Sequence, residues 1–269
     1  MTRRGFSLVE LLVTMAVVGV LGTALARLLV GNSRFVAQQE AQLDARQTSR
    51  AAMNVMATDL RMLTANGVVA ASTDSVKVRV PFAFGVLCRV AGSNRIASLM
   101  PVDSMMYATS IAEGVAIRAA SGSYTIVNGV TASPSANGGA CAMDSIRVVP
   151  GGRLVALSAT LSAWPPGALF YLFQTVRYRF GPSGDLPGRV GLFRQAGGID
   201  QEMLAPFDAG AGFGFLVGTR LTLRATPPAT LDSIEGLELR LIAESRETPP
   251  GQVEPARFAL RPRIKFVNR

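Results

Sequence analysis

The fold of this chain is decided by residues 1–30, which read MTRRGFSLVELLVTMAVVGVLGTALARLLV. Residues 6–29 are apolar apart from two charged side chains and a few hydroxyls. As an α-helix these 24 residues are about 36 Å long, more than the roughly 30 Å hydrocarbon core of a bilayer. The sequence therefore predicts a transmembrane helix over residues 6–30.

Two basic residues, Arg3 and Arg4, precede the apolar run. The positive-inside rule then keeps the N-terminus in the cytoplasm and sends the rest of the chain across the membrane. A cleavable secretory signal peptide is an alternative, because Ala24 and Ala26 loosely fit a small-x-small cleavage site. Glu10 argues against it, since a carboxylate costs about 2.5–3.5 kcal/mol at the membrane centre, less near an interface, and is expected to serve a function there.

Residues 5–13, GFSLVELLV, closely resemble the cleavage and methylation motif of type IV pilins and type II secretion pseudopilins. The resemblance implies that a prepilin peptidase cuts after Gly5 and that the exposed Phe6 is N-methylated, so residues 1–5 form a leader peptide. Glu10 is then the fifth residue of the mature chain and the assembly carboxylate. In a stack of helices it can reach the Phe6 ammonium of a neighbour, and such pairing offsets desolvation only if both charges are present.

The same resemblance implies a location and a set of partners. We expect a single-pass protein of the bacterial inner membrane with a cytoplasmic N-terminus and a periplasmic globular head, which can be extracted into a filament. Its expected partners are other pilin or pseudopilin subunits, bound through the N-terminal helix, together with the prepilin peptidase and the inner-membrane assembly platform.

Residues 31–65 predict a soluble second half of the same helix, because they lack proline and are rich in helix-forming residues. An apolar stripe at helical spacing is expected to pack against a core: Met53, Met56, Leu60 and Leu63. Asn66 and Gly67 are expected to end the helix as a C-cap.

Residues 66–269 predict a globular head rich in antiparallel strands, which makes the fold class α+β. Apolar and polar residues alternate as in half-buried strands. The alternating runs are residues 76–80, 176–180, 237–241 and 258–266, the last broken by Pro262. The expected loops are residues 131–140, 181–191, 225–230 and 247–256, and the glycine-rich residues 210–218 predict a β-turn or bulge.

Composition argues against catalysis. The chain has no histidine, which removes the commonest general base and every His-ligated metal site. The two lysines, Lys77 and Lys265, are predicted on polar strand faces, where they cannot activate a serine by burial. We therefore expect no enzyme activity, no cofactor and no metal site. The net charge of +9 is spread along the chain, so nucleic acid is a less favoured partner.

The two cysteines, Cys88 and Cys141, are separated by 53 residues and do not form a CxxC motif. Export places them in an oxidising compartment, where a disulfide persists. The sequence leaves open whether they form that bond or remain two separate buried thiols.

A weaker resemblance concerns the head. The segments 176–178, 191–194 and 234–239 follow the order seen in J-type pseudopilins and W-type minor pilins, which have large heads. The resemblance implies a minor pilin or pseudopilin, a structural or assembly-priming subunit of a type IV pilus or a type II secretion pseudopilus. The alternative is a binding module at a pilus tip, for adhesion or DNA uptake.

Overall fold

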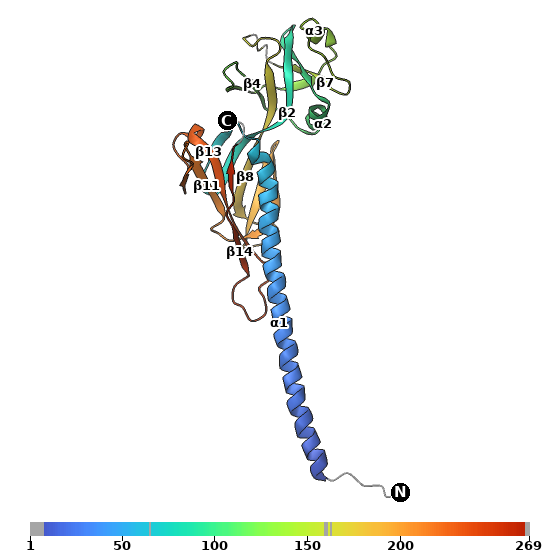
Figure 1. The fold of residues 1–269 in the computed structure, drawn as a ribbon, viewed down its shortest axis with the longest axis vertical. Coiled ribbons are helices and arrows are strands. Elements are labelled where there is room, and N and C mark those ends of the chain that lie inside the picture. Colours follow the sequence, from blue (N-terminus) through green and yellow to red (C-terminus); the bar gives the residue numbers. More distant parts are fainter. Residues whose placement is uncertain (1–7, 65, 159–160, 162, 267–269) are drawn as a thin grey trace, which may run out of the picture.

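The computed structural model describes residues 8–64, 66–158, 161 and 163–266. One long helix, α1 (Leu8–Arg61, 54 residues), carries a β-rich head at its C-terminal end. Its first half extends away from the head, and its second half packs along it (Figure 1). The predicted α+β fold, a long N-terminal helix on a mainly antiparallel head, is confirmed.

The head is built on one extended set of paired strands, all antiparallel. Its strands are β1 (Val68–Ala71), β2 (Ser75–Ala91), β3 (Asn94–Leu99), β4 (Gly114–Arg118), β5 (Tyr124–Asn128), β6 (Ala132–Pro134), β7 (Arg153–Leu157), β8 (Leu169–Pro182), β9 (Val190–Ala196), β10 (Ile199–Phe207), β11 (Gly212–Val217), β12 (Thr222–Arg224), β13 (Ile234–Glu244), β14 (Arg257–Leu260) and β15 (Arg263–Lys265). Three short helices join them: α2 (Pro101–Thr109), α3 (Gly138–Ala142) and η1 (Leu231–Ser233).

The head has two lobes, which are visible in Figure 1. The helix lobe packs on α1 and contains the described residues of 62–81 and 174–266, whereas the distal lobe contains the described residues of 82–173. The paired strands β2 and β8 run through both lobes, from Ser75 opposite Arg179 to Val86 opposite Leu169. Their register shifts just after Pro81, where the two cores separate. A proline at a bulge is the expected way to interrupt and bend a strand.

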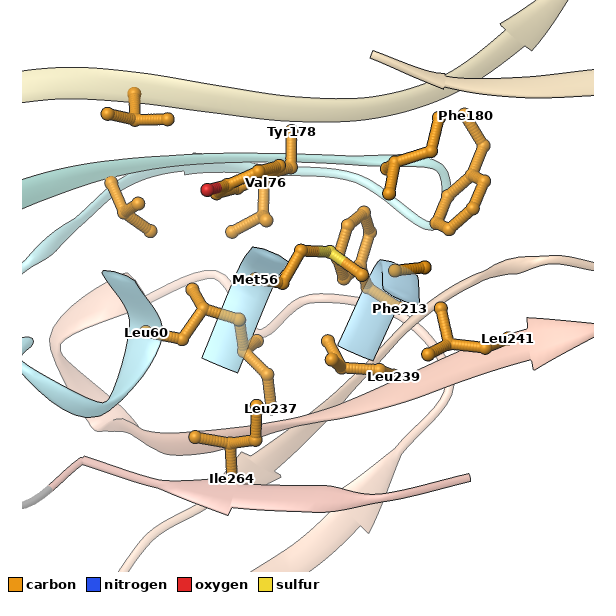
Figure 2. Close-up of a cluster of buried hydrophobic side chains, with 14 of the residues drawn as sticks. Met56, Leu60, Val76, Tyr178, Phe180, Phe213, Leu237, Leu239, Leu241 and Ile264 are labelled. Carbon is orange, nitrogen blue, oxygen red and sulfur yellow. The ribbon is translucent and has the colours of Figure 1, made fainter. Parts of the chain in front are cut away.

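Each lobe has its own hydrophobic interior. In the helix lobe, Met56 and Leu60 of α1 lie between the β2–β8 layer and the β11–β13 layer (Figure 2). In the distal lobe a separate core gathers around side chains such as Leu87, Leu99 and Phe170. None of the described α1 residues belongs to the distal cores.

The helix ends earlier than predicted, at Arg61 rather than at Asn66 and Gly67. Leu63, two residues beyond this end, is fully buried in the core of the helix lobe. The predicted cap residues instead form a turn, in which Asn66 has φ +61° and Gly67 N donates to Thr64 O at 3.1 Å.

Two further local predictions were wrong. Residues 131–140 were expected to form a loop, but they contain β6 and the start of α3. Residues 210–218 were expected to form a turn or bulge, but most of them form the buried strand β11. Their glycines allow close approach, since a Cβ on Gly212 would lie 2.3 Å from the Thr73 carbonyl oxygen.

Candidate assembly helix and its attachment to the head

The first half of α1 exposes apolar side chains on every side. From Leu8 to Val30 its large apolar residues are 51–77% exposed. A helix that is hydrophobic all round and is not buried in a protein core suits a membrane interior. Among the described residues, α1 is the one helix that is long and apolar enough to cross a bilayer.

The polar groups of this segment are few and sit close to the helix backbone. The Thr14 hydroxyl reaches Leu11 O at 2.8 Å and Glu10 O at 2.9 Å, and the Thr23 hydroxyl donates to Val20 O at 2.8 Å. Such bonds satisfy the hydroxyl groups within the helix, so that they need no hydrogen-bond partner from an apolar solvent. Glu10 is exposed in the first turns of the helix. The predicted cleavage and methylation residues, Gly5 and Phe6, lie outside the described residues.

The second half of α1 attaches to the helix lobe first through its apolar stripe. Met56, Leu60 and Leu63 are completely buried, and Met53 packs against the same core while partly exposed. Burying each large apolar side chain contributes about 1.5–3 kcal/mol. The predicted packing role of the stripe is confirmed, and Met56 makes its contacts as an ordinary core side chain.

A partly buried polar triad adds a second attachment. Tyr178 on β8 donates its hydroxyl hydrogen to Asp59 Oδ2 of α1 at 2.6 Å, and Arg194 on β9 reaches the same oxygen at 3.1 Å. Burial, followed by the Asp59 carboxylate, raises the pKa of the Tyr178 phenol well above its ordinary value of 10.0. Burial alone would lower the pKa of Arg194, but Tyr178 and Asp59 outweigh it and raise that pKa. The triad fixes the rotation of α1 relative to the strands.

A third attachment joins α1 to β13 and β14. The Ser49 hydroxyl lies 3.3 Å from Leu241 O and 3.2 Å from Phe258 O. The Arg46 guanidinium lies over the Phe258 ring, 5.4 Å from its centroid. These contacts place α1 against the end of the sheet that faces the membrane segment.

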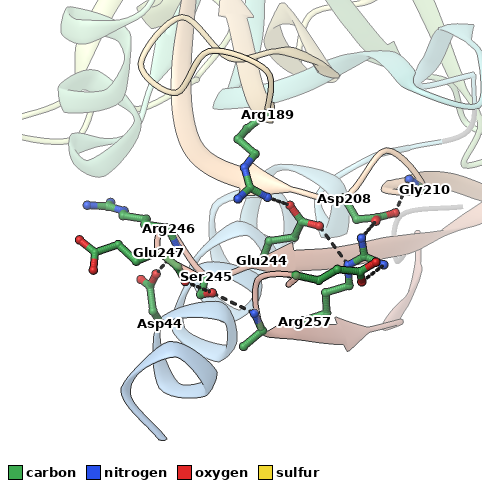
Figure 3. A network of polar contacts seen from close by, with 11 residues as sticks. Asp44, Arg189, Asp208, Gly210, Glu244, Ser245, Arg246, Glu247 and Arg257 are labelled. Atoms are coloured by element: carbon green, nitrogen blue, oxygen red, sulfur yellow. Dashed lines mark hydrogen bonds and ion pairs between the residues drawn. The ribbon is translucent and has the colours of Figure 1, made fainter. Parts of the chain in front are cut away.

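An ion-pair network stabilises the neighbouring strand ends (Figure 3). Glu244 is 5% exposed and binds both Arg189 and Arg257, the latter through Nε at 3.0 Å. Arg257 also pairs with Asp208, 3.2 Å away. At the start of the following loop, Asp44 of α1 accepts a hydrogen bond from the Arg246 backbone N–H at 2.9 Å.

The distal lobe, which has no part in these contacts with α1, contains a covalent cross-link. The structure joins Cys88 on β2 to Cys141 on α3 by a disulfide bond. Beside it, Arg89 Nη2 lies 2.6 Å from Asp144 Oδ1, and this hydrogen bond lowers the pKa of Asp144. The disulfide and the ion pair both hold α3 and the turn after it against β2.

Neither the triad nor the Glu244 network was predicted from the sequence. The sequence gives only an indirect indication of each. Tyr178 lies at an inward position of the alternating run 176–180, where a buried phenol needs a polar partner. Glu244 occupies a buried position at the end of β13, and a buried carboxylate likewise requires paired cations. Within the part of the chain that the structure describes, no group of three or more potential metal-ligating side chains comes together.

Comparison with protein families gives one match. Residues 1–26 match the prokaryotic N-terminal methylation motif. Comparison with curated proteins and with solved structures gave no match. The motif and the long apolar helix together support a type IV pilin-like or pseudopilin protein, of a kind known for structural rather than catalytic roles. Such a protein is processed by a prepilin peptidase and assembles with other pilins, and its apolar N-terminal helix is compatible with membrane anchoring.

Proposed function

We propose that this protein is a minor pilin or pseudopilin, a structural or assembly-priming subunit of a type IV pilus or a type II secretion pseudopilus. The observation that carries the proposal is the first half of α1, whose apolar side chains are exposed on all sides and which continues the matched motif of residues 1–26. The three weakly similar head segments and the large head favour a J-type or W-type minor subunit.

In this proposal the subunit occupies two states in turn, one in the membrane and one in a filament. It first lies in the bacterial inner membrane, with the N-terminus cytoplasmic, residues 6–30 across the bilayer and the head periplasmic. The peptidase then cuts between Gly5 and Phe6, the new terminus is methylated, and the assembly platform moves the subunit into a filament. In the filament the exposed apolar helix packs against the helices of other subunits instead of lipid.

We assign Glu10 to assembly rather than to insertion or cleavage. Phe6 and Glu10 are four residues apart, about 6 Å along the helix, so both charges lie near one end of the membrane segment. When a neighbouring helix is offset by that rise, the Glu10 carboxylate meets the Phe6 ammonium. Removing the carboxylate leaves the cation without its partner, which typically costs about 3–5 kcal/mol in a buried pair.

The test compares Glu10→Ala with Thr14→Ala, a control that removes a polar group from the same helix without changing charge. Glu10→Ala should insert and be cleaved but should lose crosslinking to partner subunits in membranes. Thr14→Ala should keep all three properties. A cleaved Glu10→Ala protein that crosslinks at the parental yield would contradict the assembly role, and an uncleaved one would make Glu10 part of the peptidase signal.

Processing is tested separately. Replacing Gly5 by a bulky residue should leave the precursor uncut, because the peptidase must reach the backbone beside that residue. N-terminal sequencing of the parental protein should begin at N-methyl-Phe6. A mature chain that begins after Ala26 would instead identify residues 1–26 as a secretory signal peptide.

A tip-located binding module is the second candidate, and one observation favours it. The distal lobe lies farthest from the membrane helix and exposes apolar side chains on α2, with Val102 and Met105 each 70% exposed. A subunit at a filament tip would present this lobe outward, as adhesion or DNA uptake requires. For DNA, binding of duplex by the head should fall steeply as salt rises; binding that ignores salt would argue against DNA uptake.

A further inference from the structure

The loop between β13 and β14, residues 246–256, runs along α1 toward its apolar half (Figure 1). Near its base the loop faces Glu40 and Asp44 of the helix across one cavity. At its tip it faces Gly31 and Arg34 across a second cavity. The loop therefore follows the helix back to the point where the expected membrane span ends.

The loop is held in a defined shape. At its base, the Ser245 hydroxyl donates to Glu247 O at 2.6 Å and accepts from the Ala256 N–H at 3.0 Å. At its tip, Gln252 N donates to Pro249 O at 3.0 Å, and Gly251 has φ +86°. With proline at residue 250, this is the pattern of a type II turn. The tip is thus fixed before it meets any partner.

The depth of the tip follows from helix geometry. With Phe6 at the cytoplasmic edge of the hydrocarbon, a core about 30 Å thick ends about 20 residues later, near residue 26. The headgroup layer adds roughly 5–7 Å, which is three to five further residues. Gly31, beside the loop tip, then lies at the outer boundary of the periplasmic headgroups.

The chemistry of this region suits a phospholipid interface. Phe35 on α1 is 60% exposed, and Val253, the residue after the 249–252 turn, is 97% exposed. Within the described residues, Arg27 and Arg34 form no ion pair. Arginine side chains near the end of a membrane helix extend to the headgroups, and phenylalanine is among the apolar residues that enter a membrane interface.

We propose that the tip of the β13–β14 loop, together with Arg34 and Phe35, forms a foot that rests on the phospholipid headgroups of the periplasmic leaflet. The foot sets the depth and tilt of the subunit before it is extracted. This inference rests on the membrane topology proposed above. Continuity with the apolar helix selects lipid as the partner, and the phosphate groups complement the arginine side chains.

The test uses the full chain in vesicles of phosphatidylethanolamine and phosphatidylglycerol. An environment-sensitive fluorophore is attached at Val253→Cys, at the distal control Ala120→Cys and at the membrane control Val17→Cys, with the parent chain labelled in parallel. The label at residue 253 should emit at shorter wavelength than the label at residue 120, because its surroundings are less polar. A quencher carried on the lipid headgroup should quench the label at residue 253 and leave the label at residue 120 unchanged. Arg34→Gln should reduce the quenching at residue 253, whereas Arg50→Gln, farther along the helix, should not.

Equal quenching at residues 253 and 120 would overturn the foot. A label at residue 253 that responds to protein density but not to the lipid quencher would place the tip against a second copy and would also overturn it. The label at residue 17 separates this failure from failure of the topology. Quenching there by lipids carrying bromine in their acyl chains reports an inserted helix, whatever the loop does.

Discussion

The helix lobe and the distal lobe share two strands but are held together by different interactions. Side chains of α1 complete the core of the helix lobe, and a polar triad and an ion-pair network fix the helix against the strands. The distal lobe receives no side chain from α1 and carries the disulfide between Cys88 and Cys141. A lobe that lacks the helix has less apolar surface to bury, and a cross-link compensates for a small core.

This contrast predicts that the two lobes respond separately to perturbation. Substitutions on α1 should lower amide protection in the helix lobe and leave it unchanged in the distal lobe. Loss of the disulfide should lower amide protection in the distal lobe and leave it unchanged in the helix lobe. Hydrogen exchange of backbone amides distinguishes the two cases, because it reports opening strand by strand.

The largest effect is expected from removing the disulfide. Closing a loop of 53 residues stabilises a fold by about 4 kcal/mol in the chain-entropy model. The Cys88→Ser/Cys141→Ser variant should therefore lose protection in β3, β7 and α3 while β13 keeps its protection. Free-thiol labelling of the denatured, unreduced parent should give no label, and two labels per chain would show that the bond is not formed. A reductant should leave the double variant unchanged.

An effect of similar size is expected in the helix lobe. Leu60→Ala removes a completely buried side chain from α1 and should cost about 2–5 kcal/mol. Protection should fall in β11 and β13 and persist in β3 and β7. Leu43→Ala is the control on the same helix, since Leu43 is 52% exposed. Equal loss of protection in both lobes would show that they unfold as one unit.

The polar triad should contribute less than the core. Asp59→Asn weakens the partner of one buried donor, Tyr178, and one partly exposed donor, Arg194, which costs about 1–3 kcal/mol. Because the pKa of Tyr178 is raised in the folded state, folding retains a proton that the unfolded chain releases above pH about 10. Stability should therefore fall as pH rises beyond that value, and Tyr178→Phe should remove part of this fall. Unchanged alkaline unfolding in Tyr178→Phe would contradict the assignment.

The smallest effect is expected at the ion pair of Arg89 and Asp144 in the distal lobe. The pKa of Asp144 is lowered in the folded state, so its contribution is present above the ordinary carboxyl range and is lost as pH falls through the lower folded value. The protection factors of the α3 amides, which are corrected for the pH dependence of intrinsic exchange, should therefore fall in acid. In Arg89→Gln that acid dependence should disappear, with protection of β13 unaltered at every pH.

The alternation of apolar and polar residues predicted the strands that have one face in the core and one face toward solvent. The alternating runs 76–80, 176–180 and 237–241 lie in β2, β8 and β13, and Pro262 separates β14 from β15 as its missing N–H requires. The apolar stripe on the second half of the long helix was predicted from periodicity as well, because apolar residues at helical spacing lie on one face, which packs against a core.

The two lobes could not be predicted in this way. Residues 80–83 of β2 are all buried, and residues 82–88 are all apolar, so alternation disappears from the sequence and no local signal distinguishes a second core. The glycines of β11 were misleading because their role is close approach between distant segments, which only the folded chain reveals. The partners of Tyr178 are likewise 16 and 119 residues away in the sequence.

The paired strands β2 and β8 also determine how the molecule carries mechanical load. When α1 is pulled while a partner holds the distal lobe, the force is transmitted between the two lobes along these two strands. Each strand crosses from one lobe to the other, so the load is carried along two covalent backbones whose pairing extends from Ser75 opposite Arg179 to Val86 opposite Leu169. If the protein is pulled within a filament, neither lobe is therefore attached through a single strand, and the register shift after Pro81 is the one interruption of the β2–β8 ladder between them.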